Sequence, residues 1–307
     1  MSPSSRLARY GWQPADPVRR PMLFVNPNSG GGRAARAGVA ERASERGIDV
    51  SVLGPQRSLA TLVDEAVASG ADALGSAGGD GSLAVVAAAA RAHGLPFVCI
   101  PAGTRNHFAI DLGVDPHDLI GALDAFTDGV ERRIDVAEVN GRLFLNNVSL
   151  GIYGDAVRRE GYRDAKARTL LETAREVLGP SASTSELQLV DDLGHEHRSP
   201  AVVLVSNNPY ALDRPPVGAT RPALDSGQLG VVVLDAPSPR RTPVRAWAAT
   251  SLEVTGPGPV HAGVDGEAVD LSPPLRFSIR PAALRVRISP RHPGVSPSGL
   301  LAPERGA

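Results

Sequence analysis

The chain has little cysteine, no long apolar run and almost no net charge, and each shortage excludes a class of protein. Cys99 is the single cysteine among 307 residues, so the fold cannot depend on an internal disulfide. No apolar run reaches the roughly 20 residues that a membrane-spanning helix needs, and residues 1–20 lack the apolar core of a secretory signal. A net charge of −1 gives no overall attraction to nucleic acid. These absences predict a cytoplasmic protein without a transmembrane segment or a nucleic-acid partner.

The residues that are present predict two domains of different class. Hydrophobic residues make up 42% of the chain, enough for a sizeable core. Strands and helices alternate over residues 21–130, which predicts an α/β domain with a parallel sheet and helices on both faces. Residues 131–290 show many short strands and one long helix at 153–178, as in a β-sandwich. The Pro, Gly and Ser content of residues 1–20 and 291–307 predicts poor order.

Three glycine-containing turns follow strands in the first domain. They are Asn26–Gly30, Gly78–Ser82 and residues 101–106. The carboxyl ends of parallel strands share one edge of a sheet, so we expect the turns to meet where open α/β sheets bind ligands. Glycine lets the backbone approach a ligand closely, and the first N–H groups of a following helix favour an anion. The turns therefore predict a phosphate-binding site.

Asp80 lies inside the second turn, where a carboxylate beside a phosphate is unfavourable unless a metal or a proton transfer accounts for it. Taken alone, this turn is also compatible with an ordinary strand–helix connection in which Asp80 caps the helix. The first turn alone is compatible with a plain Asn-Pro turn, and it lacks the Gly-Lys-Ser/Thr ending of a Walker A loop. No single turn decides between these interpretations.

Taken together, the three motifs resemble the diacylglycerol kinase catalytic domain, which sphingosine kinases and bacterial lipid kinases share. Two further matches lie downstream, at Asn146–Gly151 and in Val264-Asp265-Gly266-Glu267. The resemblance extends over about residues 21–289. It implies an NAD-kinase-like α/β domain and a β-sandwich domain that binds the lipid, with ATP in a cleft between them and Mg²⁺ accompanying the nucleotide.

The resemblance also assigns site residues. Asp80 and Glu267 are the candidate catalytic bases, since phosphoryl transfer to an alcohol needs a carboxylate to receive the hydroxyl proton. Closure of the two domains would bring them together. Taken alone, Asp265–Glu267 favours an exposed hairpin turn, because Asp-Gly is a strong turn signal. The residues expected to line the nucleotide site are Asn26, Pro27, Asn28, Ser29, Gly30, Gly78, Gly79, Asp80, Gly81, Ser82, Thr104 and Asn106.

The chain departs from the family pattern at two positions. His107 and Ser226 stand where the family usually has aspartates, and in bacterial relatives those carboxylates belong to a network around a structural Mg²⁺. The remaining Asp225 and a hydroxyl make a weak Mg²⁺ site, so we expect the structural site to be missing or altered. Arg105, within the third motif, is equally compatible with a phosphate contact and with a solvated charge.

These observations predict an ATP-dependent lipid kinase that phosphorylates a lipid hydroxyl, most simply that of diacylglycerol, at a membrane surface. A basic run at 158–168 is either a solvated face or a docking surface for anionic lipid. An NAD kinase is one alternative, because it shares the Gly-Gly-Asp-Gly turn. A nucleotide-binding module that has lost catalysis is another, motivated by His107 and Ser226. Exposed sandwich edges leave a homodimer open.

Overall fold

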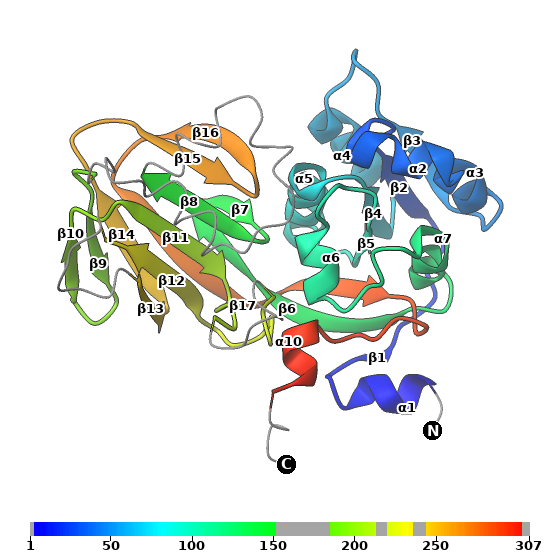
Figure 1. Cartoon of the computed structure of the whole chain (residues 1–307). Helices are drawn as coiled ribbons and strands as arrows, with labels where there is room; N and C mark the ends of the chain where they lie inside the picture. The colour runs from blue at the N-terminus through cyan, green and yellow to red at the C-terminus, as the bar shows by residue number, and fades with distance from the viewer. Residues whose placement is uncertain (1–2, 152–184, 213–219, 236–243, 303–307) are drawn as a thin grey trace. The chain divides into compact units, whose positions relative to one another are not determined.

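The computed structural model describes residues 3–151, 185–212, 220–235 and 244–302 (Figure 1). The helix expected at 153–178 and the basic run at 158–168 lie outside these ranges. The chain divides into two compact units, one formed by Met1–Ile134 with Ala282–Ala307 and the other by Asp135–Pro281. Within the described ranges, no helix is long and apolar enough to cross a lipid bilayer.

The first unit is built on a parallel sheet whose strand order is β3-β2-β4-β5, and every neighbouring pair is parallel. All residues of β4 and β5 are buried, as expected when helices cover both faces of a sheet. The predicted parallel α/β domain is thereby confirmed. The strands are β2 (Pro21–Val25), β3 (Asp49–Val52), β4 (Ala73–Ala77) and β5 (Phe97–Ile100).

Helices connect these strands, and the longest, α5, directly follows the second glycine turn. Its buried side chains, Leu83, Val86, Ala87 and Ala90, recur at the helical period and form one apolar face. Ser58 caps α4, because its Oγ accepts a hydrogen bond from the Thr61 N–H at 3.1 Å. The connecting elements are η1 (Ser29–Gly31), α2 (Arg33–Arg36), α3 (Val39–Ser44), α4 (Leu59–Ala68), α5 (Asp80–Ala92), α6 (His107–Asp111), α7 (Leu119–Ala122) and η2 (Leu123–Phe126).

The two ends of the chain pack together in the first unit. Trp12 is buried, and its indole N–H donates to the Gly294 carbonyl at 2.6 Å. Leu7 is also buried, and the Arg6 guanidinium donates to the His292 carbonyl. Composition predicted poor order for residues 1–20 and 291–307, and in their described parts the structure differs. Composition counts polar and small residues, but it does not reveal that a few apolar side chains find partners far along the chain. These segments contain α1 (Pro3–Ala8), β1 (Gln13–Pro14) and α10 (Pro297–Leu300).

The second unit is a two-layer β structure. One layer is an antiparallel sheet of order β13-β12-β11-β8-β15-β16. The other layer contains β10, β9, β14 and the first part of β17, with β6 and β7. Its strands are β6 (Val130–Val139), β7 (Arg142–Phe144), β8 (Asn147–Gly151), β9 (Gln188–Asp191), β10 (Glu196–Arg198), β11 (Val202–Asn207), β12 (Leu229–Leu234), β13 (Val244–Ala249), β14 (Ser251–Thr255), β15 (Val260–Val264), β16 (Glu267–Leu271) and β17 (Leu275–Ile288).

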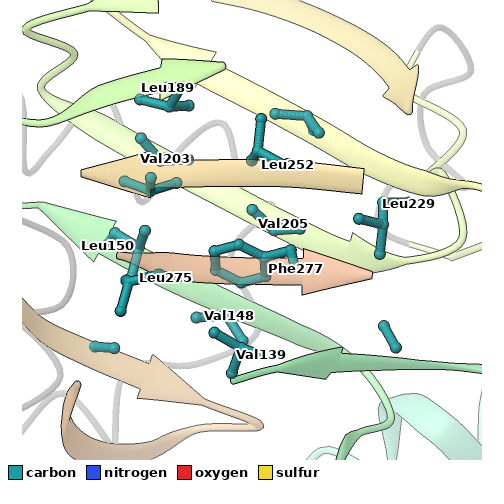
Figure 2. Packing of buried hydrophobic residues seen from close by; sticks show 14 of the residues in the cluster. Val139, Val148, Leu150, Leu189, Val203, Val205, Leu229, Leu252, Leu275 and Phe277 are labelled. Carbon is teal, nitrogen blue, oxygen red and sulfur yellow. The ribbon is translucent and has the colours of Figure 1, made fainter. Parts of the chain in front are cut away.

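The core of the second unit lies between these layers. Figure 2 shows Val203 and Val205 of β11 beside Leu252 of β14 and Phe277 of β17, and all are buried. Side chains from the inner faces of both layers thus share one apolar cluster, the packing expected of a sandwich. The predicted all-β second domain is confirmed by this arrangement.

Strand β17 sets the boundary between the units. Residues 275–278 pair with β14 in the second unit, whereas Val286 and Arg287 pair with β5 in the first. The second compact unit accordingly ends at Pro281. Ala282, which has a φ of 50°, is the first residue of β17 that belongs to the first unit. An alternating sequence pattern identifies a strand but does not show where a long strand exchanges one partner for another.

A buried histidine lies in the C-terminal segment of the first unit. His292 is 2% exposed, and its Nδ1 accepts a hydrogen bond from the Asp115 N–H at 3.1 Å. Burial lowers the pKa of His292 below its ordinary value of 6.5, and the repulsion of Arg291 acts in the same direction. The carboxylates of Asp115, Asp118 and Asp124 oppose this shift without reversing it.

We therefore expect the free energy of unfolding to fall as the pH drops below about 6.5, because the unfolded chain binds the His292 proton more readily. His292→Asn keeps a hydrogen-bond acceptor and should flatten this loss, measured by urea unfolding across the pH series. His93→Asn, at an exposed histidine, is the matched control. An equal acid slope in wild type and His292→Asn would contradict the assignment.

Candidate functional site

The three glycine turns lie at the carboxyl ends of adjacent parallel strands. Asn26 follows β2, Gly78 follows β4 and Pro101 follows β5. The backbone N–H of Asn26 donates to the carbonyl of Ala77, the last residue of β4, at 2.9 Å. The predicted convergence of the turns at one sheet edge is therefore what the structure shows.

A side-chain hydrogen bond joins the first turn to the second. The Ser29 Oγ accepts from the Gly79 N–H at 3.2 Å. Within the first turn, the Asn26 Oδ1 accepts from the Asn28 N–H at 3.1 Å, an Asx turn that shapes the backbone before the glycines. Asn26 and Ser29 thus fix the positions of the turns relative to one another.

Missing Cβ atoms allow the turns to approach one another. Gly30 has a φ of 56°, and a Cβ there would lie 2.5 Å from the Ala102 carbonyl oxygen. A Cβ on Gly103 would lie 2.9 Å from the Gly79 Cα. Real Cβ atoms do not tolerate such distances from backbone, so glycine is required at both positions.

Asn106 shapes the third turn from within. It is 4% exposed with a φ of 54°. Its Oδ1 accepts from the Gly103 N–H at 2.8 Å, and its Nδ2 donates to the Gly103 carbonyl at 3.0 Å. Both polar atoms of the side chain are therefore engaged inside the turn. Thr104 and Arg105, in contrast, are exposed, and His107 begins α6 half-buried.

Arg33 is a site residue that the sequence analysis missed. From the start of α2, its guanidinium donates to the Gly103 carbonyl at 3.1 Å and to the Pro116 carbonyl at 2.6 Å. It therefore links the first turn to the third and brings a positive charge to the glycine turns. The available signal was a basic residue directly after Gly30-Gly31-Gly32, but nothing in the sequence indicates that its partners lie some 70 residues away.

The first turn of α5 completes the site. Gly79 is the N-cap, Asp80 is the first helical residue and no side chain caps the helix. The first N–H groups of an α-helix lack the intrahelical acceptors that later ones have, and the helix dipole favours an anion beside them. A Cβ on Gly78 would lie 2.9 Å from the Ser82 Cβ, so the chain folds back tightly here.

Cys99 lies in β5, close enough to Asp80 for their charges to interact. Burial raises the pKa of the Cys99 thiol well above its ordinary range, and the negative charge of Asp80 raises it further. Cys99 is therefore a neutral thiol in the wall of the site and not a nucleophile.

The region around Ser226 does not fit a structural Mg²⁺. The backbone N–H and the Oγ of Ser226 both donate to the Asn208 Oδ1, at 2.8 and 2.7 Å. The Asp135 Oδ2 accepts from the Gly227 N–H at 2.7 Å. Over the residues that the structure describes, no three carboxylate, imidazole or thiol groups gather as a metal site. The Ser226 hydroxyl thus bonds the Asn208 amide, and the Asp135 carboxylate bonds a backbone N–H group.

In the second unit, Asp265 and Glu267 have separate roles. Asp265 and Gly266, with φ values of 47° and 85°, form the two-residue turn of the β15–β16 hairpin. Asp265 is 8% exposed, and its carboxylate accepts from three backbone N–H groups, so it is structural. Glu267 projects from the first residue of β16 with 57% of its side chain exposed, 3.8 Å from Arg142. The structure thus leaves Glu267, but not Asp265, accessible to a substrate.

Comparison with known proteins identifies the chain. Residues 20–139 match the model of the family described as diacylglycerol kinase catalytic domain. A Pseudomonas aeruginosa protein named "Probable lipid kinase YegS-like" is 30% identical over 292 residues, covering 87% of this chain and 93% of that protein. A Mycobacterium tuberculosis diacylglycerol kinase is 34% identical over 126 residues, 40% of this chain and 41% of that protein.

A solved structure of a Bacillus anthracis diacylglycerol kinase covers 90% of this chain and 99% of its own, with a TM-score of 0.64 and 18% identity, which shows a shared fold. The two-unit fold and the three glycine turns at the edge of its parallel sheet define the class of protein. The chain belongs to the diacylglycerol kinase catalytic domain family, and the resemblance predicted from its motifs is confirmed.

Two neighbouring glycines test whether close approach of the turns is needed for phosphate binding. Gly30 and Gly31 both have positive φ, at 56° and 66°, but a Cβ on Gly31 meets nothing within 4 Å. We expect Gly30→Ala to weaken ATP binding by at least tenfold, or about 1.4 kcal/mol, because it separates the first turn from the third. Gly31→Ala carries the same backbone strain without the clash. Equal affinities of the two variants in calorimetric titration would contradict the assignment.

Proposed function

We propose that the protein is an ATP-dependent lipid kinase that transfers the γ-phosphate to a lipid hydroxyl, with diacylglycerol as the preferred acceptor. The observation that carries the proposal is the joining of three glycine turns around the N-terminus of α5, through the Ser29–Gly79 hydrogen bond and the contact of Gly30 with Ala102. The names of the relatives, lipid kinase and diacylglycerol kinase, support the acceptor class.

The backbone of the first unit would hold the nucleotide phosphates. The N–H groups at the start of α5 present partial positive charge, and Arg33 adds a full charge beside the third turn. Asp80, at the same helix end, is the carboxylate suited to hold Mg²⁺. A bound Mg²⁺ would offset the charge of the phosphate oxygens. The N-terminus of α5 would then position the phosphoryl group that is transferred. The bound Mg²⁺ would explain why the Asp80 carboxylate lies beside an anion.

Glu267 is our proposed base. A lipid hydroxyl is a poor nucleophile until its proton has an acceptor, and a positioned carboxylate supplies one. The turn that precedes Glu267 is held by the three N–H bonds of Asp265, which restricts where the Glu267 carboxylate can reach. The proposal requires the Glu267 carboxylate to reach the acceptor hydroxyl during turnover.

The proposal is tested by incubating the pure protein with Mg²⁺, labelled ATP and mixed micelles of one lipid at a time. Diacylglycerol, a sphingoid base, ceramide and phosphatidylglycerol are the acceptors, with NAD and a lipid-free sample alongside. We expect label in diacylglycerol, because relatives of this chain are named diacylglycerol kinase. Label in NAD alone would replace the proposal with an NAD kinase. ATP binding without label in any acceptor would favour a module that has lost catalysis.

The role of Glu267 is tested by Glu267→Gln, which keeps the side-chain shape but removes the base. We expect kcat to fall by about 10² or more, the usual contribution of general base catalysis, with the KM for ATP little changed. Glu196→Gln is the matched control, since Glu196 is also exposed and paired with an arginine, Arg198, in the second unit. Unchanged turnover in Glu267→Gln would remove Glu267 from the mechanism and leave Asp80→Asn as the next variant.

A further inference from the structure

Arg221 is a buried cation in the polar centre of the second unit. Its side chain is fully shielded from solvent. One guanidinium nitrogen donates to the carbonyls of Leu145 and Asn207, at 2.6 and 2.7 Å, and another donates to the Asn146 Oδ1 at 3.0 Å. Burial of a charge is costly unless hydrogen bonds compensate it, so a fully buried guanidinium bonded to these oxygens is a specific structural device.

The loop that Arg221 contacts is also held by a carboxylate. Leu145 and Asn146 connect β7 to β8, and Asn147 is the first residue of β8; their three N–H groups donate to Asp265 at 2.8, 2.7 and 3.2 Å. The Asp265 N–H in turn donates to the Asn147 carbonyl at 3.0 Å. Oxygen atoms of the loop thus bind a buried cation, while its N–H groups bind a buried anion. Residues 145–147 are fixed between two opposite charges.

This loop positions the hairpin that carries Glu267. Asp265 is the first turn residue of the hairpin, and Glu267 lies two residues further on. Strand β15 also pairs with β8 directly beside the loop, with Val264 opposite Val148. A displacement of the loop would therefore move the turn and redirect the Glu267 carboxylate.

The same contacts concern the structural Mg²⁺, which the residues around Ser226 do not fit. Main-chain carbonyl and amide oxygens are ligands that hard divalent cations prefer. Here three such oxygens, from Leu145, Asn207 and Asn146, accept hydrogen bonds from the guanidinium instead. Asn207 continues the network by donating to the Asp135 and Leu145 carbonyls at 3.1 and 3.3 Å. The positive charge of Arg221 would repel a divalent ion placed among these oxygens.

We propose that Arg221 acts as a covalently attached internal cation that takes the organising role of a structural metal ion, and that it is a positioning residue for the Glu267 hairpin. The guanidinium acts through the 145–147 loop and Asp265, and touches no reacting atom. Its positioning role rests on the proposed function, whereas its role in ordering the loop does not.

Hydrogen exchange tests the loop without any assay of activity. Arg221→Lys keeps the charge but loses the planar set of donors. We expect the amides of residues 145–147 to exchange about tenfold faster or more, an opening penalty reduced by about 1.4 kcal/mol. The amides of the glycine turns should be unaffected. Arg287→Lys is the matched control, because Arg287 is also a buried arginine, 4% exposed, but belongs to the first unit.

Asn146→Ala is a milder second variant, in case Arg221→Lys fails to fold. It removes one of the three oxygen partners of Arg221, and we expect a smaller increase in exchange over the same loop. Loop amides that exchange as in wild type in the folded variant would overturn the proposal.

The metal arm uses the wild-type protein without nucleotide. We expect the midpoint of thermal unfolding to be the same in EDTA and in millimolar Mg²⁺, because Arg221 already supplies the internal charge. A midpoint that falls in EDTA and is restored by Mg²⁺ would show a bound structural metal and overturn the proposed replacement.

The kinetic arm separates this proposal from the proposed function. In the lipid kinase assay, we expect Arg221→Lys to lower kcat by about tenfold to a hundredfold, the cost of a small misplacement of a catalytic group, with the KM for ATP unchanged. If the wild type phosphorylates no lipid, the proposed function fails while the exchange result still decides the role of Arg221. If the wild type is active and Arg221→Lys matches Arg287→Lys in kcat, the positioning role fails while the proposed function stands.

Discussion

The contact between backbone atoms of three glycine turns is the constraint on which the first unit depends. Gly30 lies against the Ala102 carbonyl and Gly103 lies against Gly79, at distances that no side chain would allow. The parallel sheet brings the turns to one edge, but strands about 4.8 Å apart do not by themselves close the turns around a ligand. The Ser29–Gly79 hydrogen bond and the Arg33 guanidinium hold the closed arrangement. The phosphate site of backbone N–H groups that we propose depends on that closure.

In the second unit, two buried charged side chains fix the position of a loop. Its sandwich core is apolar (Figure 2), yet the loop beside β8 is fixed by the Arg221 guanidinium and the Asp265 carboxylate. Two opposite charges that each hold several main-chain groups define one geometry, because an unpaired charge in the interior would cost several kcal/mol. Apolar contacts alone would fix the position of this loop less specifically than these hydrogen bonds do. This arrangement fixes the turn of the β15–β16 hairpin, which Glu267 directly follows.

Strand β17 contributes residues to both units. Strand β17 leaves a sandwich layer and continues as a strand beside β5, and the C-terminal segment after it covers Trp12 and Leu7 in the first unit. Glu131 pairs there with Arg285 and Arg287. Burial of Glu131 opposes ionisation, but hydrogen bonds from both arginines outweigh it and lower the pKa of this carboxyl. The described parts of both terminal segments are thus integral to the first unit.

The sequence by itself determined the two fold classes, the family and the three turns, because alternation of strands and helices, glycine placement and motif order are local properties of the chain. It also identified Asp80 and Glu267 as candidates, with their roles still to be tested. Only the tertiary structure decided that Asn106 and Asp265 are structural, that Arg33 joins two turns and that Arg221 is a buried cation. Asn106 bonds Gly103, three residues away, but its left-handed backbone and its burial are set by the folded chain. The roles of Asp265, Arg33 and Arg221 depend on hydrogen bonds to main-chain groups 70 or more residues away, which leave no local pattern. The same physical reason explains the unexpected packing of Trp12 against Gly294.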